Sequence, residues 1–250
     1  MAENIRKKGA TLKYVKGSPR SDEYEKLLIW EYFGFATEGY FVEVGAHHPK
    51  RLSQTWLLEK VGWKGILIEP LPEYCALLRR ERPSAVICQV AVSAPGKTGV
   101  ADFFVSSDLS TLDPKIRNLR EQFGSVIQVD VTTVDNLLER ETPSRVDFVS
   151  IDTEGTELDV LKGFDVSRYR PSLILLEDSV YTLDLHEHLL GQRYKLVRRT
   201  GINNWYIPRE KPFHVPLAER ARLFRKMRLG TPLRAWRFRR AAEETGTSGR

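Results

Sequence analysis

Short apolar segments alternate with amphipathic segments along the first half of the chain, and this alternation constrains the fold more than any other feature. Three apolar segments are predicted as strands and two intervening segments as helices: strands over 40–44, 65–69 and 85–92, and helices over 52–61 and 72–80. Strands that alternate with helices build a parallel sheet with helices packed on both faces. The sequence therefore predicts an α/β fold of the Rossmann-like kind.

The same alternation resumes after residue 146 and ends in a predicted hairpin. Strands are expected over 146–152 and 173–177, helices over 156–163 and 183–190, and two further strands over 194–199 and 205–208. A short segment around Gly201 separates the last two strands, which suits an antiparallel turn. In the less regular middle, strands are expected over 100–105 and 126–131, and a helix over 114–123. We expect a mostly parallel seven-stranded sheet that ends in an antiparallel hairpin.

The charge of the chain is divided unevenly, which separates a central domain from two basic ends. Of the net charge of +6, residues 1–20 carry +5 and residues 209–250 carry +8, so residues 21–208 carry −7. We expect a basic N-terminal arm and helix over 1–37, one α/β domain over 38–210 and a basic extension over 211–250. An acidic central domain argues against a nucleic-acid partner, because such a protein carries basic residues on its binding face.

The C-terminal extension contains an amphipathic helix pattern rich in arginine. Its apolar positions are spaced by 4, 3 and 3 residues: Leu217, Ala221, Phe224 and Met227. Gly230 and Pro232 are expected to end this helix. Two interpretations remain open: a peripheral contact with an anionic membrane or a lipid-linked acceptor, or packing on the domain or on the partner of a homodimer. The packing interpretation is the simpler of the two.

Nothing in the sequence predicts a membrane span or a disulfide scaffold. No apolar run approaches the ~20 residues of a membrane-spanning helix, and residues 1–20 lack the apolar core of a secretory signal. The two cysteines, Cys75 and Cys88, form no metal motif and are expected to stay reduced in or near the core. We expect a cytoplasmic protein.

Acidic residues follow the main predicted strands at the end where an open α/β sheet binds its ligands. The segments are Glu43-Val44-Gly45-Ala46-His47-His48, then Glu69, then Asp152 with Glu154, and finally Glu177 with Asp178. Because the carboxyl ends of neighbouring parallel strands lie at one edge of a sheet, we expect these side chains to border one site.

The glycine pattern after the first strand argues against a dinucleotide. A dinucleotide site needs G-x-G-x-x-G so that the backbone approaches the pyrophosphate, whereas Gly45 stands alone before two histidines and Pro49. Glu43 would repel a phosphate and suits a cofactor that carries an ammonium and a sulfonium. Glu69, 24 residues after Gly45, is placed to accept hydrogen bonds from ribose hydroxyls.

Five segments carry a more specific signal: Phe41–Ala46, Ile68–Pro70, Val146–Glu157, Leu161–Gly163 and Asn203–Pro208. Together they resemble the FkbM-type methyltransferases, and the block from Asp152 to Gly163 is the most specific part. The resemblance covers residues 38–210. It implies a class I methyltransferase fold, S-adenosylmethionine as the cofactor, and methyl transfer to an oxygen, often on a sugar or a natural product.

The expected site divides into a cofactor part and a metal part. Cofactor contacts are expected from Glu43, Gly45, Glu69, Ala91 and Asp152. Three carboxylates at two neighbouring strand ends would suit Mg²⁺, a pattern similar to that of metal-dependent O-methyltransferases: Asp152, Glu177 and Asp178. Glu154 is the expected general base, because an alcohol must lose its proton on methylation, and His47 is a second candidate.

Two other functions remain open from the sequence. The acidic cluster would also serve a metal-dependent phosphoesterase or nuclease, although Glu43 and Glu69 would then have no purpose. A non-catalytic protein would keep the fold for assembly and would bind no cofactor. The favoured function is an O-methyltransferase that uses S-adenosylmethionine and Mg²⁺ and acts on a hydroxyl of a small molecule or carbohydrate.

Overall fold

The computed structural model describes residues 22–106, 110–113, 124–177, 183–233 and 236. Three predictions fall outside these residues: the helix over 114–123, the metal ligand Asp178, and the basic arm before residue 22. The end of the basic extension, residues 237–250, also lies outside them.

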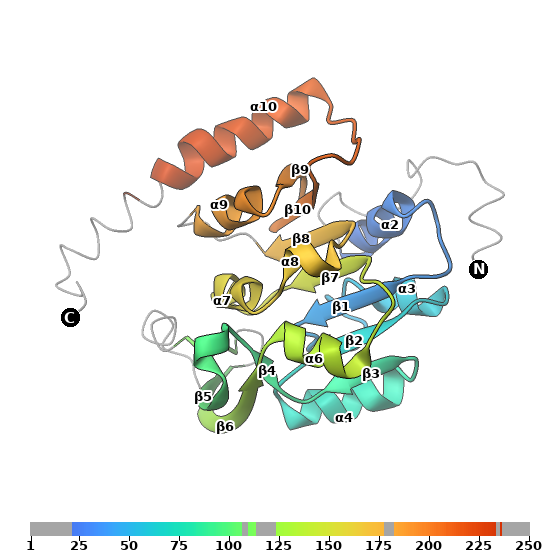
Figure 1. The fold of residues 1–250 in the computed structure, drawn as a ribbon, viewed down its shortest axis with the longest axis vertical. Helices are drawn as coiled ribbons and strands as arrows, with labels where there is room; N and C mark the ends of the chain where they lie inside the picture. Colours follow the sequence, from blue (N-terminus) through green and yellow to red (C-terminus); the bar gives the residue numbers. More distant parts are fainter. Residues whose placement is uncertain (1–21, 107–109, 114–123, 178–182, 234–235, 237–250) are drawn as a thin grey trace.

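A seven-stranded sheet runs through the centre of the domain (Figure 1). Its strands follow the order β3-β2-β1-β7-β8-β10-β9. Their bounds are β1 Tyr40–Val44, β2 Lys64–Ile68, β3 Ala85–Cys88, β7 Phe148–Ile151, β8 Leu173–Glu177, β9 Tyr194–Thr200 and β10 Asn203–Pro208. The first five strands in this order pair in parallel, whereas β10 is antiparallel to both β8 and β9. The predicted parallel sheet with a terminal hairpin is confirmed.

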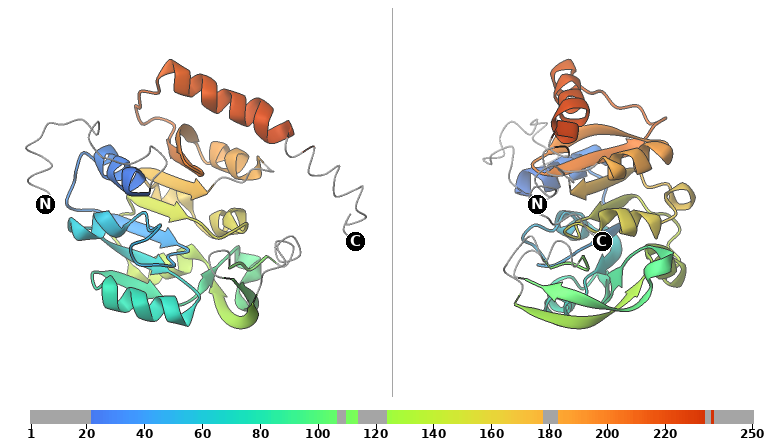
Figure 2. Two further views of the ribbon diagram at one scale, coloured as in Figure 1. Left: turned by 180° about the vertical axis from the view of Figure 1, so that it is seen from behind. Right: turned by 90° about the vertical axis from the view of Figure 1, so that its left-hand side faces the viewer.

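Two apolar cores lie on the two faces of this sheet, because successive residues of a strand point to opposite faces. Val42 and Val44 pack on one side against four helices: α6 Val134–Glu141, α7 Glu157–Lys162, α8 Val166–Tyr169 and α9 Asp184–Gly191. Phe41 and Trp205 pack on the other against α2 Asp22–Tyr32, α3 Trp56–Lys60 and α4 Pro72–Glu81. Figure 2 shows these layers from two further directions.

A second, three-stranded sheet has the order β4-β6-β5. Its strands are β4 Ala91–Val92, β5 Gly99–Val105 and β6 Ser125–Thr132, and the 3-10 helix η2 Pro95–Lys97 precedes β5. The single strand predicted over 85–92 is therefore wrong: Cys88 ends β3, and Ala91 and Val92 pair with β6. Periodicity does not reveal this break, because the residues on both sides of Gln89 are apolar.

Helix α6 has no counterpart among the predicted helices. Thr133 begins it by accepting a hydrogen bond from the Asn136 amide, at 3.1 Å, as an N-cap residue does. Its buried residues Val134, Leu137 and Leu138 face the core. The cap and the apolar spacing together are the local signal that marks this helix in the sequence.

The basic extension forms a long helix beside the terminal hairpin (Figure 1). Helix α10 spans Leu217–Arg225 and continues through a π turn, η3 Lys226–Gly230, into helical residues 231–233 and 236. The prediction that Gly230 and Pro232 end the helix is wrong. A proline clashes with the carbonyl four residues back in a regular α-helix, but the π turn, in which the Thr231 amide donates to the Lys226 carbonyl, alters that geometry. Within the described ranges, no helix is long and apolar enough to cross a bilayer.

Gly65 lies where β2 passes close to β1, and this approach gives a prediction about stability. A Cβ atom at residue 65 would overlap the carbonyl oxygen of Phe41, whereas one at Gly96 would meet open space. Gly65→Ala should lower the free energy of unfolding by about 2 kcal/mol, and the control Gly96→Ala by less than about 0.5 kcal/mol. Urea denaturation followed by circular dichroism measures both, and equal stabilities would contradict the packing of β1 on β2.

Candidate functional site

A cavity of about 510 Å³ opens at the carboxyl ends of β1, β2, β7 and β8. This volume lies in the range of small-molecule sites. Ser110, Leu112 and the turn between β9 and β10 complete its wall. Among the described residues, six acidic side chains line it against one arginine, Arg51: Glu25, Glu43, Glu69, Asp152, Glu154 and Glu177. Such a wall favours a small cationic ligand over a polyanion.

Gly45 lies in the cavity wall between the end of β2 and the end of β7. Its backbone is left-handed, with φ +80°, and its amide donates to the Ile68 carbonyl at 3.0 Å. A Cβ atom here would overlap the backbone carbonyl of Asp152, because β1 and β7 are neighbours and Val44 lies opposite Ile151. Both the φ and this close approach require glycine at the position.

Glu69 lies directly after β2 and is almost entirely buried. Its Oε2 accepts a hydrogen bond from the His47 amide at 2.8 Å, and its Oε1 accepts one from the Leu71 amide at 2.9 Å. Burial raises the pKa of this carboxyl to about 7, although the two backbone donors lower it. Each oxygen keeps the capacity to accept another hydrogen bond, which suits the predicted contact with ribose hydroxyls.

Glu43 lines the same cavity, but the loop before α3 holds its carboxylate. Oε2 accepts hydrogen bonds from the hydroxyls of Ser53 and Thr55, and Oε1 accepts one from the Gln54 amide at 2.7 Å. These bonds draw the loop away from helical geometry, so the helix predicted over 52–61 begins only at Trp56. Glu43 therefore shapes the loop and adds negative charge to the cavity wall.

A fully buried arginine, Arg82, lies behind Glu43 and directly follows α4. Its guanidinium pairs with Glu59 and lies 3.9 Å from the Glu43 carboxylate. It also donates to the hydroxyls of Ser53 and Thr55, at 3.0 and 2.9 Å, and the same hydroxyls donate to Glu43. Buried charges are tolerated only when they are paired and hydrogen-bonded, so this network fixes the loop against the cavity.

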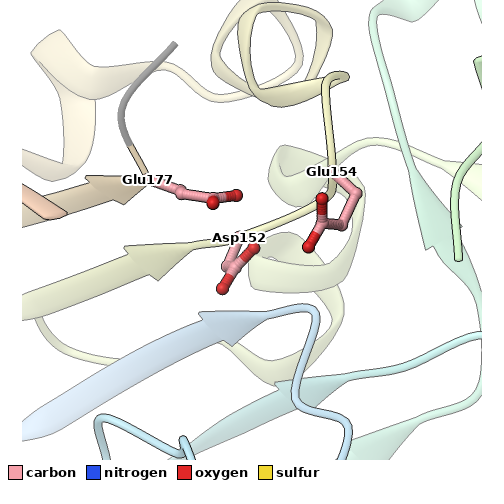
Figure 3. Close-up of side chains that lie close together, drawn as sticks. All are labelled: Asp152, Glu154 and Glu177. Atoms are coloured by element: carbon pink, nitrogen blue, oxygen red, sulfur yellow. The ribbon is translucent and has the colours of Figure 1, made fainter. Parts of the chain in front are cut away.

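Asp152, Glu154 and Glu177 form an acidic cluster where β7 and β8 end (Figure 3). One carboxylate oxygen from each lies within 4.8 Å of the other two. Burial raises the pKa of Asp152 and of Glu177, and the charges of Asp152 and Glu154 raise that of Glu177 further. The cluster unites two of the predicted metal ligands with the predicted base, while Asp178 lies outside the described residues. Three carboxylates this close share a proton or bind a cation.

A strained loop presents Glu154 to this cluster. Its φ is +54°, in the left-handed region that residues other than glycine rarely adopt. The buried Glu157 carboxylate holds the loop by accepting hydrogen bonds from the amides of Thr153 and Gly155, at 3.1 and 2.9 Å. Thr111 donates its hydroxyl to the Glu154 carbonyl at 3.0 Å. Strain that is held in this way is typical of functional sites.

Two further predicted residues, Ala91 and His47, also line the cavity. Ala91 is buried and small. His47 has a φ of +42°, and its ring packs on Tyr74 with 3.9 Å between ring centroids. The bond from its amide to Glu69 gives His47 a positioning role, and proton transfer by its ring stays a prediction.

Among the cavity residues that are absent from the sequence predictions, Glu25 and Gln54 are two polar ones. Glu25 of α2 accepts hydrogen bonds from the Thr200 hydroxyl and from the Asn203 side chain, the latter at 2.7 Å. No local pattern reveals this contact, because 178 residues separate Glu25 from Asn203. Among the described residues, Gln54 Oε1 is the buried side-chain atom that lacks a hydrogen-bond partner. The polar run Ser53-Gln54-Thr55 inside a predicted helix is the signal that marks it.

The strand order and the position of the cavity define the class of protein. A mostly parallel sheet of seven strands in this order, with its ligand cavity at the carboxyl edge, is the Rossmann-like class I methyltransferase fold. The sequence matches the family model of the methyltransferase FkbM domain over residues 43–196. The chain therefore belongs to the FkbM family of S-adenosylmethionine-dependent methyltransferases, as the five sequence segments predict.

Solved structures with a related fold are distant in sequence. The METTL16 methyltransferase domain has a TM-score of 0.47 and 12% identity, over 81% of this chain and 73% of that chain. Precorrin-6y C5,15-methyltransferase from Geobacter metallireducens has a TM-score of 0.40 and 15% identity, over 79% and 91%. A methyltransferase-like protein from Silicibacter pomeroyi has a TM-score of 0.41 and 15% identity, over 85% and 96%. No curated protein sequence matches the chain.

The buried network around Arg82 gives a prediction about stability. Arg82→Met removes the partner of the buried Glu59, so the free energy of unfolding should fall by about 3–5 kcal/mol. Arg82→Lys should also destabilise, because an ammonium cannot reproduce the fork that reaches Ser53 and Thr55. The matched control is Arg79→Met, at an exposed position of α4, with a change below about 0.5 kcal/mol. Chemical denaturation measures all three, and a stable Arg82→Met variant would contradict the network.

Proposed function

We propose that the chain transfers the methyl group of S-adenosylmethionine to a hydroxyl oxygen of a sugar, oligosaccharide, glycolipid or related natural product, with assistance from Mg²⁺. The observation that carries this proposal is the acidic cluster of Asp152, Glu154 and Glu177, which lies on the wall of the cavity that also contains Gly45 and Glu69. An acceptor hydroxyl has a proton that must leave. Carboxylates and a bound cation are groups that accept or weaken such a proton.

The residues of the cavity fit S-adenosylmethionine. This cofactor supplies an electrophilic methyl group on a sulfonium, and its cationic groups suit a wall rich in carboxylates. Glu69 would accept the ribose hydroxyls, and the buried Gln54 Oε1 would accept a hydrogen bond from the ammonium. The bare backbone of Gly45 and the small side chain of Ala91 leave room for the cofactor. Glu43 and Asp152 would contribute charge.

The chain must hold the acceptor oxygen about 3 Å from the methyl carbon and on the axis of the carbon–sulfur bond. The carbon–oxygen bond forms as the carbon–sulfur bond breaks, and the electron pair of the broken bond stays on sulfur. The hydroxyl proton passes to a carboxylate, for which Glu154 is the proposed base and His47 the second candidate. The position of Glu154 supports this role, because its carboxylate lines the cavity beside Asp152 and Glu177.

The same cluster fits Mg²⁺, which prefers oxygen ligands. Asp152 and Glu177 would hold the ion, with Glu154 within reach. The ion would supply positive charge that lowers the pKa of an acceptor hydroxyl. Burial raises the pKa values of Asp152 and Glu177, and the charge of Asp152 raises that of Glu177 further, so a nearby cation would favour their ionised forms.

The two alternative functions fit the cavity less well. A phosphoesterase or nuclease binds a polyanion, which six carboxylates in the wall would repel. Membership of a methyltransferase family gives that function no support. A non-catalytic protein has no use for the acidic cluster, and it differs from the proposed enzyme in having no affinity for S-adenosylhomocysteine.

The pKa of Glu69 gives a prediction about cofactor binding. The free carboxyl is largely neutral below pH 7, whereas hydrogen bonds from ribose hydroxyls favour the ionised form. Binding therefore lowers this pKa, and the affinity for S-adenosylhomocysteine should rise several-fold from about pH 6 to about pH 8. Isothermal titration calorimetry across this interval measures the effect.

Glu69→Gln is the control for this titration, because it keeps the shape and removes the charge. Its affinity should be lower at pH 8 and should change little with pH. A wild-type protein that binds no S-adenosylhomocysteine would overturn the cofactor assignment. A wild-type pH profile that Glu69→Gln reproduces would remove Glu69 from the ribose contact.

The acidic cluster gives a prediction about the acceptor and the metal. Methyl transfer from radiolabelled S-adenosylmethionine to a panel of sugars and glycolipids should require Mg²⁺ and stop in excess EDTA. Asp152→Asn and Glu177→Gln should each lower the rate at least about 100-fold, since each removes a ligand charge. The matched control is Glu139→Gln, a half-exposed carboxylate on α6, which should act as the wild type does.

A second measurement separates loss of metal from loss of folding. Binding of Mn²⁺, followed by electron paramagnetic resonance, should weaken in Asp152→Asn while thermal stability is kept. Full activity in excess EDTA would exclude the metal. Label that appears on amine or carbon acceptors and never on hydroxyls would overturn the proposed O-methylation.

A further inference from the structure

Helix α10 and its continuation expose large apolar side chains along the side that faces away from the domain. Leu217 is 78% exposed, Phe224 64% and Leu229 62%, and Leu233 and Trp236 are about half exposed. Of the interpretations that the sequence leaves open, packing of the apolar face on the domain does not hold for Leu217 and Phe224, whereas contact with a membrane or with a dimer partner stays a prediction. The helix packs on the domain through Leu223, Met227 and Thr231 instead. The exposed residues form a second apolar face, here called the outer stripe.

The π turn keeps this outer stripe in register. Its members are separated by 4, 3, 5, 4 and 3 residues: Leu217, Ala221, Phe224, Leu229, Leu233 and Trp236. Steps of 3 or 4 residues correspond to one turn of an α-helix. The single step of 5 residues spans the π turn Lys226–Gly230, where one turn takes more residues. All six positions therefore share one face of the helix, which a regular α-helix would not achieve.

Basic side chains accompany the outer stripe. The segment from Leu217 to Gly230 contains five basic residues and one acidic residue, Glu219: Arg220, Arg222, Arg225, Lys226 and Arg228. All four arginines are exposed. Glu219 is engaged by Arg222 at 2.8 Å, so the segment carries a net charge of +4 beside its apolar stripe.

Polar contacts fix the helix along the terminal hairpin. Arg222 donates to the Arg199 carbonyl at 3.0 Å, and Lys226 lies 3.4 Å from the Asn204 side-chain oxygen. Figures 1 and 2 show α10 as the outermost helix, beyond the hairpin strands β9 and β10. The outer stripe is thus held rigidly on the outside of the domain.

We propose that α10 lies in the interface of a lipid bilayer that contains anionic headgroups, with the outer stripe toward the acyl chains. An apolar face bordered by arginines is the pattern of helices that bind such an interface in its plane. The arginines supply the charge complementarity, and Trp236 is of the type that favours the headgroup level. This proposal stands independently of the proposed methylation.

Two other occupants fit the surface less well. A symmetric contact between two copies brings the same patch together with itself, which would place five basic residues against five. A nucleic acid would pair with the arginines but would leave the leucines of the outer stripe facing water. An anionic bilayer satisfies both the charge and the apolar side chains.

The test uses the full chain and vesicles of phosphatidylcholine with or without an equal part of phosphatidylglycerol. The wild type should sediment with the anionic vesicles, bind neutral vesicles far more weakly, and detach as salt is raised. Leu217→Ser with Phe224→Ser should reduce the partition coefficient about tenfold or more. The control pair Val100→Ser with Val126→Ser, which removes exposed apolar side chains from β5 and β6, should bind as the wild type does.

The contribution of the arginines and the insertion of Trp236 into the bilayer are tested separately. Arg225→Gln with Arg228→Gln should reduce binding about 20-fold, and Arg79→Gln with Arg80→Gln on α4 is the matched control. Tryptophan emission should shift to the blue on anionic vesicles, and Trp236→Phe should remove most of the shift. Trp30, Trp63 and Trp205 are fully buried, and the partly buried Trp56 lies on α3, outside the outer stripe.

Three results would overturn the proposal. The first is vesicle binding that the Leu217→Ser, Phe224→Ser pair leaves unchanged. The second is a dimer in light scattering that this pair converts to a monomer, with no vesicle binding in the wild type. The third is binding to a single-stranded RNA oligonucleotide without binding to anionic vesicles.

Discussion

The parallel pairing of β1 with β7 is the constraint on which the site depends. It sets Val44 opposite Ile151, so the loops that follow the two strands begin at the same level of the sheet. Gly45 and Asp152 then approach so closely that no side chain fits between them. The loop after β1, which is predicted to bind the cofactor, therefore contacts the loop after β7, which carries Asp152 of the acidic cluster. A transfer reaction needs this arrangement, because its two reactants must meet within about 3 Å.

The carboxylates of the cavity are chemically alike, but their hydrogen bonds and neighbours give them different roles. Glu43 accepts three hydrogen bonds from one loop and is backed by Arg82, so it mainly supports structure. Glu69 accepts two backbone hydrogen bonds and keeps acceptor capacity for a ligand. Asp152 and Glu177 are neighbours; burial raises the pKa values of both, and the charge of Asp152 raises that of Glu177 further. Of these carboxylates, only the pair of Asp152 and Glu177 needs a bound proton or cation to offset its negative charge.

Local patterns in the sequence predict much of this fold and the ends of its main strands. Buried parallel strands are continuous apolar runs, so their ends and the carboxylates after them are visible in the chain. The break at Gln89 is invisible, because a change of sheet does not alter the composition of the strand. Arg82 and Glu25 are also hidden, because their partners lie far away in sequence and depend on the finished fold. The positive φ of Glu154 is also hidden, because residues other than glycine rarely adopt it.

The hairpin of β9 and β10 connects the acidic cavity to the basic helix. Its Thr200 and Asn203 bind Glu25 on the cavity side, while Arg199 and Asn204 contact α10. Arg199 contacts α10 through its backbone carbonyl and Asn204 through its side chain, so one short ribbon serves both surfaces. The net charge of +6 conceals this division, because an acidic interior site and a basic outer helix partly cancel in the sum. The π turn likewise gives α10 two distinct faces. It aligns the outer stripe on one face, while Leu223 and Met227 on the other stay packed on the domain.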